Sequence, residues 1–360
     1  MSDLLEMLYR EQTLRRGELI ELLDRLDGDE SLRQRLYRYA LAVRVCMYGN
    51  RVFLRGLIEF SSFCRKDCLY CGLRRSNRDA GRYRMTVDEI LACCEEGYRL
   101  GFRTFVLQSG EDMWYTADRL ESLIRQIKGR FPEAALTLSV GERPREEYER
   151  FFRAGADRFL LRHETASRPL YRRLHPDASF EERVRCLRDL KDIGYQVGAG
   201  FMVGLPGQTN EDLAEDLLFL KNLEPDMVGI GPFIPHSRTP LAGQGGGTVE
   251  KTRVMVALTR LMLPEANIPA TTALGTLQPD GRELALLAGA NVMMPNLTPT
   301  AYRPKYALYE NKICNDDEAS VCLGCLNMRI RLAGFEVDMG RGDSASYLAR
   351  RGKDQAVPAT

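Results

Sequence analysis

Three cysteines early in the chain have a spacing that suits an iron–sulfur cluster. Cys64, Cys68 and Cys71 form a C-x₃-C-x₂-C motif directly after a run over 54–62 that predicts a strand. Three thiolates can ligate three irons of a [4Fe–4S] cube, and the fourth iron then stays open to the amino and carboxylate groups of a small molecule. A reduced cluster of this kind can pass one electron into a sulfonium and break a C–S bond.

A structural zinc site and a set of unrelated thiols are the alternatives to this cluster. Structural zinc sites usually have four protein ligands, and no fourth cysteine or histidine lies near the motif. The histidines of the chain are distant in sequence: His163, His175 and His236. The spacing, together with the aromatic Tyr70 before the last cysteine, therefore favours the cluster.

A second group of cysteines, Cys314-x₇-Cys322-x₂-Cys325, lies near the end of the chain. Three thiols at this spacing can bind an accessory [2Fe–2S] or [4Fe–4S] cluster, completed by water or a non-protein ligand. The alternative is three reduced surface thiols. The remaining cysteines are expected to be small buried residues: Cys46, Cys93, Cys94 and Cys186.

Composition narrows the class of protein. The chain has 51 basic and 50 acidic residues and a net charge of +1, which argues against a nucleic-acid partner. It has no apolar run of about 18 residues, so we expect no membrane span, and no secretory signal is visible at the N-terminus. Ten cysteines without such a signal indicate a cytoplasmic protein whose thiols bind metal rather than form disulfides.

Strand-like and helix-like patterns alternate from residue 54 onward. The expected strands cover 54–62, 104–110, 135–141, 158–165, 196–205, 226–234, 270–275 and 291–296. The expected helices between them lie near 86–100, 116–129, 144–153, 179–193, 209–222, 248–263 and 280–288. This alternation predicts an α/β fold, a parallel (β/α)₈ TIM-type barrel. We expect an N-terminal helical extension over 1–53, the barrel over 54–300 and a C-terminal cap over 301–360.

A doubly wound open sheet is the structural alternative to the barrel. Its usual five or six strands fit this alternation less well. The chain also has no G-x-G-x-x-G motif after the first expected strand. The barrel is therefore the favoured fold.

The fourth expected strand carries charge on one face. Alternation places Arg158, Arg162 and Glu164 on one side, and Phe159 and Leu161 on the other. The outer face of a barrel strand packs on helices and favours Phe and Leu, so the arginines are expected to point into the lumen. Neighbouring strands add small polar residues to the lumen: Thr137, Ser139, Thr271 and Thr272. A polar lumen predicts a hydrated cavity that accepts an anion, and a buried lattice of salt bridges is the alternative.

The cysteine motif after the first strand of such a barrel resembles the radical S-adenosylmethionine (SAM) superfamily. Residues 55 to about 325 also resemble the HydE family of [FeFe]-hydrogenase maturases. Among the stretches that carry this resemblance are Gln108-Ser109-Gly110-Glu111-Asp112, Leu161-Arg162-His163-Glu164-Thr165 and Ala270-Thr271-Thr272-Ala273-Leu274-Gly275. The resemblance implies an enzyme that uses a [4Fe–4S] cluster to cleave SAM into a 5′-deoxyadenosyl radical. It further implies assembly of the diiron subcluster of the hydrogenase from a small anionic iron complex with CO, cyanide and cysteine ligands.

The resemblance also implies roles for individual residues. The implied SAM contacts are Tyr70, Gln108, Ser109, Glu164, Arg183 and Gly204, with Arg183 on the methionine carboxylate. The implied substrate pocket is lined by Thr137, Arg158, Arg162, Thr271, Thr272 and Tyr306. For Arg183 the alternative is a solvated helix charge, and for Glu164 it is a plain ion pair with Arg162.

The implied partners are other hydrogenase maturation proteins and an electron donor of flavodoxin or ferredoxin type. Two other radical SAM enzymes are rival functions. Methylornithine synthase would also have a polar lumen, whereas biotin synthase would need cysteines on its barrel strands. The C-terminal cysteines and the pair Thr271-Thr272 favour the maturase. A cluster carrier without turnover is the non-enzyme alternative, and it predicts that no 5′-deoxyadenosine forms.

Overall fold

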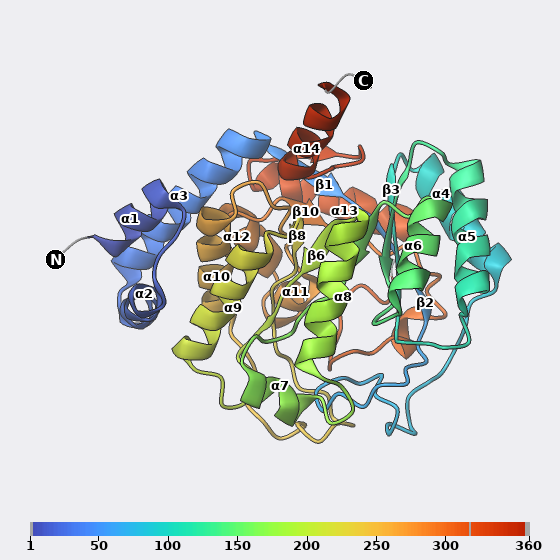
Figure 1. The fold of residues 1–360 in the computed structure, drawn as a ribbon, viewed down its shortest axis with the longest axis horizontal. Coiled ribbons are helices and arrows are strands. Elements are labelled where there is room, and N and C mark those ends of the chain that lie inside the picture. The colour runs from blue at the N-terminus through green and yellow to red at the C-terminus, as the bar shows by residue number, and fades with distance from the viewer. Residues whose placement is uncertain (1–2, 317, 357–360) are drawn as a thin grey trace.

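Parallel strands form a closed ring at the centre of the computed structural model, which describes residues 3–316 and 318–356 (Figure 1). The larger sheet runs in the order β2 (Gly56–Ser61), β3 (Thr104–Ser109), β4 (Ala135–Ser139), β5 (Arg158–Leu160), β6 (Gln196–Ala199) and β8 (Met227–Val228). Parallel bridges close the ring: Met227 with Asn267, Pro269 with Val292, and Leu57 with Asn296. The barrel prediction is therefore confirmed, and the open sheet is wrong.

Short strands extend this ring at both ends. Two of them, β7 (Met202–Val203) and β9 (Gly231–Pro232), pair above β6 and β8 at the carboxyl end. At the amino end, β1 (Arg51–Leu54) lies between β10 (Val292–Met293) and β11 (Glu336–Asp338). The first strand thus begins at Arg51, inside the segment expected to be helical.

Helices surround the ring and begin at the expected positions. They are α4 (Val87–Arg99), α5 (Ala117–Arg130), α6 (Arg145–Ala154), α8 (Phe180–Ile193), α9 (Asn210–Leu223), α10 (Val249–Met262) and α12 (Gly281–Leu287). Hydroxyl caps start most of them. In α4, the Thr86 hydroxyl accepts from the N–H of Glu89, and the Glu89 carboxylate accepts from the N–H of Thr86 at 2.7 Å. These caps fix where each helix leaves the carboxyl end of its strand.

The N-terminal extension packs on the outside of the barrel. It consists of α1 (Leu4–Glu11), α2 (Arg16–Gly28) and α3 (Glu30–Tyr48). Helix α3 lies along α10 and α2 lies along α9, and the Tyr37 hydroxyl donates to Glu250 at 2.7 Å. At the start of α9, the Asn210 side chain donates to Asp24 at 2.6 Å and to Asp27 at 3.0 Å, so α2 also contacts this end of the helix.

The C-terminal segment closes the opposite end of the barrel. After α13 (Ala319–Leu332), β11 joins the sheet beside β1, and α14 (Ala345–Ala356) follows. Between β11 and α14, residues 341–344 cross the amino end of the strands. There Asp343 accepts from Arg158 at 2.5 Å and from Gln196 at 2.6 Å, and the Arg341 carbonyl accepts from Thr104 at 2.9 Å. We call residues 341–344 the floor segment.

The expected strand over 270–275 is wrong. The chain is extended only as far as Ala270, and Thr272–Leu277 form helix α11 with Thr271 at its N-cap. A short apolar run does not separate a buried strand from a short helix by its period. Both threonines therefore stand just beyond the strand and line the cavity.

The prediction for the isolated cysteines is wrong at Cys46, which is exposed, and confirmed at Cys93, Cys94 and Cys186. On α3 the buried face carries Ala40, Arg44 and Tyr48, at intervals of four residues. Cys46 lies two residues from that row and so points outward. Among the described residues, no helix combines the length and the apolar character that crossing a membrane requires.

Candidate functional site

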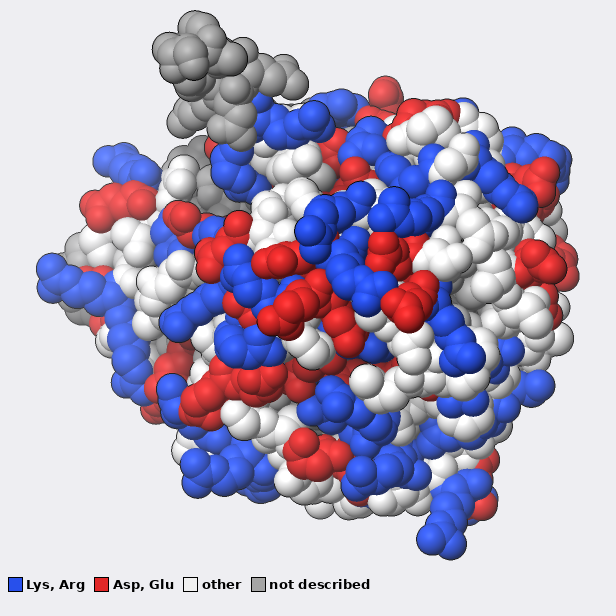
Figure 2. Space-filling view, turned by 45° about the vertical axis from the view of Figure 1, so that its right-hand side comes forward, with Lys and Arg blue, Asp and Glu red and all other residues white. Residues whose placement is uncertain are grey.

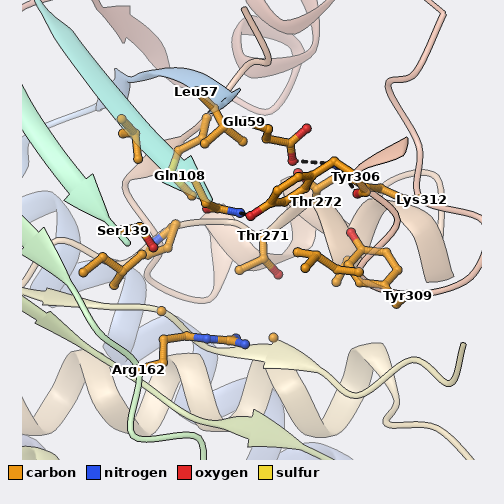
Figure 3. Close-up of a pocket in the computed structure, with 18 of the residues that line it drawn as sticks. Leu57, Glu59, Gln108, Ser139, Arg162, Thr271, Thr272, Tyr306, Tyr309 and Lys312 are labelled. Atoms are coloured by element: carbon orange, nitrogen blue, oxygen red, sulfur yellow. Dashed lines mark hydrogen bonds and ion pairs between the residues drawn. The ribbon is translucent and has the colours of Figure 1, made fainter. Parts of the chain in front are cut away.

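One cavity of about 380 Å³ runs from the cysteine motif into the lumen of the barrel. At the carboxyl ends of the strands its wall includes Cys64, Cys68 and Cys71. Deeper in the lumen the cavity is lined by residues of several strands and of the cap (Figure 3). The predicted residues that line it are Tyr70, Gln108, Ser109, Thr137, Arg162, Glu164, Arg183, Thr271, Thr272, Tyr306, Cys314 and Cys322. The structure thus brings most of the predicted site together.

The loop that carries the motif is held by backbone hydrogen bonds from three sides. The N–H of Arg65 donates to the carbonyl of Glu111, that of Leu69 to Leu174, and that of Gly72 to Leu308. Gly110, at the end of β3, allows close contact with this loop. A Cβ there would stand 2.3 Å from the Phe63 carbonyl oxygen and 2.7 Å from the Cβ of Cys64. The motif and Gln108-Ser109 are therefore fixed against each other.

The three thiols fit a metal cluster by their chemistry. Burial raises the pKa of Cys71 to about 12, and burial together with the charges of Cys71 and Cys64 raises the pKa of Cys68. Three thiolates gathered in a buried wall need a cation to compensate their charge. Within the described ranges no three Cys, His, Asp or Glu side chains converge on one metal ion. A cube binds each thiolate at a separate iron, so this arrangement does not require convergence.

Arg183 stands in the cavity wall and belongs to a buried network of charges. Its Nε donates to Glu142 at 2.7 Å, and its Nη1 donates to the carbonyl of Arg162 at 2.5 Å. Lys66 holds the other oxygen of Glu142 at 2.7 Å. Burial opposes the ionisation of Glu142, but Arg183 and Lys66 outweigh it and keep its pKa below the usual value. The interpretation of Arg183 as a solvated helix charge is therefore wrong.

Glu164 lies where β5 ends and has a left-handed backbone, with φ of 67°. Its Oε2 is 3.0 Å from the Nη2 of Arg162, so the ion pair considered as an alternative is present. The same side chain also lines the cavity. A non-glycine residue held at positive φ stores strain, and such residues occur preferentially at functional sites. Tyr70 also lines the cavity, and its hydroxyl oxygen lies 3.0 Å from Nε2 of His175.

Deeper in the lumen, polar groups face the cavity without protein partners. The hydroxyls of Thr137 and Thr271 are buried and have no hydrogen-bond partner in the described part of the chain. Arg162 points into the same space, and the Tyr306 hydroxyl accepts from Gln108 at 3.4 Å (Figure 3). Because a buried hydroxyl without a partner is costly, this region of the cavity is suited to a polar, negatively charged ligand.

Glu59 and Lys312 are lining residues that sequence reasoning missed. They form a buried ion pair of 2.5 Å between β2 and the cap, and Asn296 donates to the second Glu59 oxygen at 2.9 Å (Figure 3). A glutamate inside the apolar run Ile58-Glu59-Phe60 is the signal that points to it. The pair ties the cap to the rim of the barrel.

Three predicted site residues lie outside the cavity: Arg158, Gly204 and Cys325. Arg158 points inward but sits at the amino end of β5, where Asp343 and the Arg341 carbonyl bind it. Arg158 is therefore part of a buried network of salt bridges, the alternative to a cavity-lining role. Gly204, with φ of 82°, packs on a neighbouring loop, and a Cβ there would stand 2.2 Å from the Cα of Gly247. A glycine at position 204 lets two loops pack against each other, and it does not serve the approach of a ligand to the backbone.

The second cysteine group lies beside the cavity. Cys322 and Cys325 are one turn apart on α13, and Cys314 precedes that helix with φ of 67°. Cys314 and Cys322 line the cavity, and their hydrogen bond, with burial, raises the pKa of Cys322. Cys325 is exposed. The interpretation as surface thiols thus fits Cys325 but not Cys322.

Comparison with known proteins agrees with this arrangement. The radical SAM superfamily model matches residues 58–220. The [FeFe] hydrogenase maturase subunit HydE of Thermotoga maritima is 52% identical over 85% of this chain and 88% of its own length. The 3-methylornithine synthase of Methanosarcina barkeri is 32% identical over 80% of this chain and 81% of its own length.

Solved structures show the same fold. A crystal structure of methylornithine synthase (PylB) has a TM-score of 0.81 at 29% identity and covers 93% of this chain and 97% of that chain. The maturase HydG has a TM-score of 0.79 at 19% identity, over 97% of this chain and 77% of its own, and supports the fold alone. The chain belongs to the radical SAM superfamily, whose enzymes cleave SAM with a [4Fe–4S] cluster, and within it to the family of the [FeFe]-hydrogenase maturase HydE.

Proposed function

We propose that this radical SAM enzyme acts in [FeFe]-hydrogenase maturation, on a small anionic iron complex held in the lumen below SAM. The observation that carries the proposal is the 52% identity to a HydE protein over 85% of the chain. The polar cavity supports it, because Arg162 and the two unpartnered threonine hydroxyls suit an anion. Other maturation proteins would deliver the substrate and receive the product.

In this proposal Cys64, Cys68 and Cys71 hold the cluster, at the wall of the cavity where the strands end. When bound and reduced, the cluster supplies the electron that breaks a C–S bond of SAM. The protein's own part is to place SAM between this wall and the lumen. The three cysteines are only partly exposed at this wall, which limits the access of water and oxygen to them.

The SAM contacts follow from the upper part of the cavity. The side-chain oxygens of Gln108 and Ser109 would accept from the methionine amino group, and Tyr70 would contact the adenine. The bonds of Arg183 to Glu142 and to the Arg162 carbonyl use Nε and Nη1, which leaves Nη2 for the methionine carboxylate. Glu164 would contact the nucleoside, held in place by its ion pair with Arg162.

The substrate would lie one layer deeper. Arg162 would face its negative charge, and the hydroxyls of Thr137 and Thr271 would donate to its ligands. Thr272 and Tyr306 would complete the wall between SAM and substrate. The barrel wall around this layer would hold the substrate next to SAM and would limit the access of solvent to both.

Replacing Arg183 with lysine is expected to raise the KM for SAM about tenfold, a loss of about 1.4 kcal/mol in binding. Lysine keeps the charge that Glu142 needs, but its single ammonium group cannot hold Glu142 and the Arg162 carbonyl and also reach the methionine carboxylate. The measurement is 5′-deoxyadenosine formation at varied SAM concentration. Arg185→Lys, two residues along α8 with an exposed side chain, is the control and should leave the KM unchanged. An unchanged KM in Arg183→Lys would contradict the assigned contact.

We also propose that Cys314, Cys322 and Cys325 bind an accessory cluster that SAM cleavage does not need. The triple serine variant is expected to lose iron while it forms 5′-deoxyadenosine at a rate within about twofold of the wild type, because the SAM contacts lie elsewhere in the cavity. Iron content and product formation are measured on the same sample. Loss of cleavage in a folded triple variant would refute the assignment.

The proposed function is tested by complementation. The chain should activate [FeFe] hydrogenase in a strain that lacks its own HydE, and a Cys64→Ala variant should not. The rival function is 3-methylornithine synthase, since that relative is 32% identical. No activation, with methylornithine formed from lysine by the purified enzyme, would replace the maturase with this rival.

A further inference from the structure

The loop that carries the cluster motif is strongly basic. Residues 64–84 contain seven Lys or Arg and two Asp or Glu, a charge of +5, whereas the whole chain has +1. Arg65, Arg75 and Arg78 of this loop are exposed. Figure 1 places the loop at the lower edge of the molecule, and Figure 2 shows Lys and Arg side chains along that edge.

Exposed apolar residues stand next to this basic loop. Met113 and Trp114, in the turn after β3, are 45% and 44% exposed. Large exposed side chains of this kind, surrounded by arginine, are typical of interface anchors. Trp114 is the single tryptophan of the chain.

A stack of side chains connects Trp114 to the motif. The guanidinium of Arg119 lies 3.9 Å from the Trp114 ring, and that of Arg84 lies 5.5 Å from it. Arg84 also covers the ring of Phe63 at 3.8 Å, and Phe63 directly precedes Cys64. Asp112 holds Arg84 in place with two bonds, at 2.7 and 3.0 Å. The stack therefore reaches from the surface to Phe63, the residue before the first cysteine of the motif.

We propose that Met113, Trp114 and the arginines of this loop form the docking site of a small acidic one-electron carrier protein. The inference rests on the proposed function, because SAM cleavage consumes one electron that must come from outside the chain. In the transfer the carrier is oxidised by one electron and the cluster is reduced by one. Charge complementarity steers such a carrier to the basic loop, and the apolar anchor fixes it beside the cluster.

The test compares two electron sources on the same reconstituted enzyme. With reduced flavodoxin, an acidic carrier, Trp114→Ala and the double variant Arg75→Glu/Arg78→Glu should each need about tenfold more carrier to reach half-maximal 5′-deoxyadenosine formation. With dithionite, a small chemical reductant, both variants should match the wild type. Added salt should slow the flavodoxin-driven reaction of the wild type more than that of the double variant. Arg38→Glu, exposed on the distant α3, is the control.

The outcomes separate this inference from the proposed function. If both variants use flavodoxin as well as the wild type does, the docking site is wrong. It is also wrong if they lose hydrogenase maturation while flavodoxin-driven cleavage stays normal, because the patch then binds another maturase. If 5′-deoxyadenosine formation by the double variant also slows with dithionite, the substitutions have damaged its loop. The result for Trp114→Ala then decides whether the docking site is right. Failure of the wild type with dithionite would overturn the proposed function instead.

Discussion

Replacing Cys68 with serine is expected to reduce 5′-deoxyadenosine formation to less than about a hundredth of the wild-type rate, or about 2.7 kcal/mol of lost transition-state stabilisation. In the proposed site the three cysteines of the cavity wall bind three irons, so each thiolate is needed. A serine hydroxyl is a poor iron ligand because it stays protonated at neutral pH. The measurement is product formation after anaerobic reconstitution.

Iron content separates loss of the cluster from loss of the fold. Cys68→Ser should take up little iron in the motif, whereas Cys46→Ser, on the exposed side of α3, should keep both its iron and its activity. Both variants should unfold at the same temperature as the apo wild type. A Cys68→Ser protein that retains iron and cleaves SAM would remove this cysteine from the cluster.

Replacing Arg158 with methionine is expected to lower the free energy of unfolding by about 3–5 kcal/mol, although this residue lies outside the cavity. Arg158 is fully buried and donates to Asp343 at 2.5 Å. In the variant the Asp343 carboxylate would lose its hydrogen bond from Arg158, and the floor segment would lose two contacts with β5. Denaturant unfolding measures the change. Arg125→Met, which breaks an exposed pair on α5, is the control and should cost less than about 1 kcal/mol.

The same pair gives stability a defined pH dependence. Burial alone would raise the pKa of Asp343, but Arg158, Gln196 and Arg341 outweigh it and hold that pKa far below the usual value. Because the folded pKa is depressed, the stabilisation is complete above about pH 4 and is lost as the pH falls below it. The difference in unfolding free energy between wild type and Arg158→Met should therefore shrink in acid. A difference independent of pH would contradict the pairing.

The alternation of side chains along a strand does not distinguish the two ends of a barrel. Arg158 and Arg162 share one face of a strand, and alternation alone assigns both to the lumen. Only the ring distinguishes its two ends, since Arg158 meets the floor segment whereas Arg162 meets the cavity. Gly204 shows the same limit, because its close neighbour is Gly247, on another loop.

The partners of the charged residues also depend on tertiary structure. Arg183 looks like a solvated charge among its helix neighbours, but folding buries it against Glu142, 41 residues away. Lys312 meets Glu59 across 253 residues. No local sequence pattern identifies such pairs, because the two side chains are distant in sequence and meet only when the chain folds.

The cysteine motif and the alternation of strands and helices can be predicted from sequence because both are local. Cys64, Cys68 and Cys71 are close in the chain, and hydrophobic period and helix capping act over a few residues. The position of each polar residue along the barrel axis, by contrast, depends on the tertiary structure. It closed one end with residues 341–344 and left Arg162, Thr137 and Thr271 facing the cavity at the other. That division arises because the floor segment comes from the far end of the chain, and only folding brings it beneath the strands.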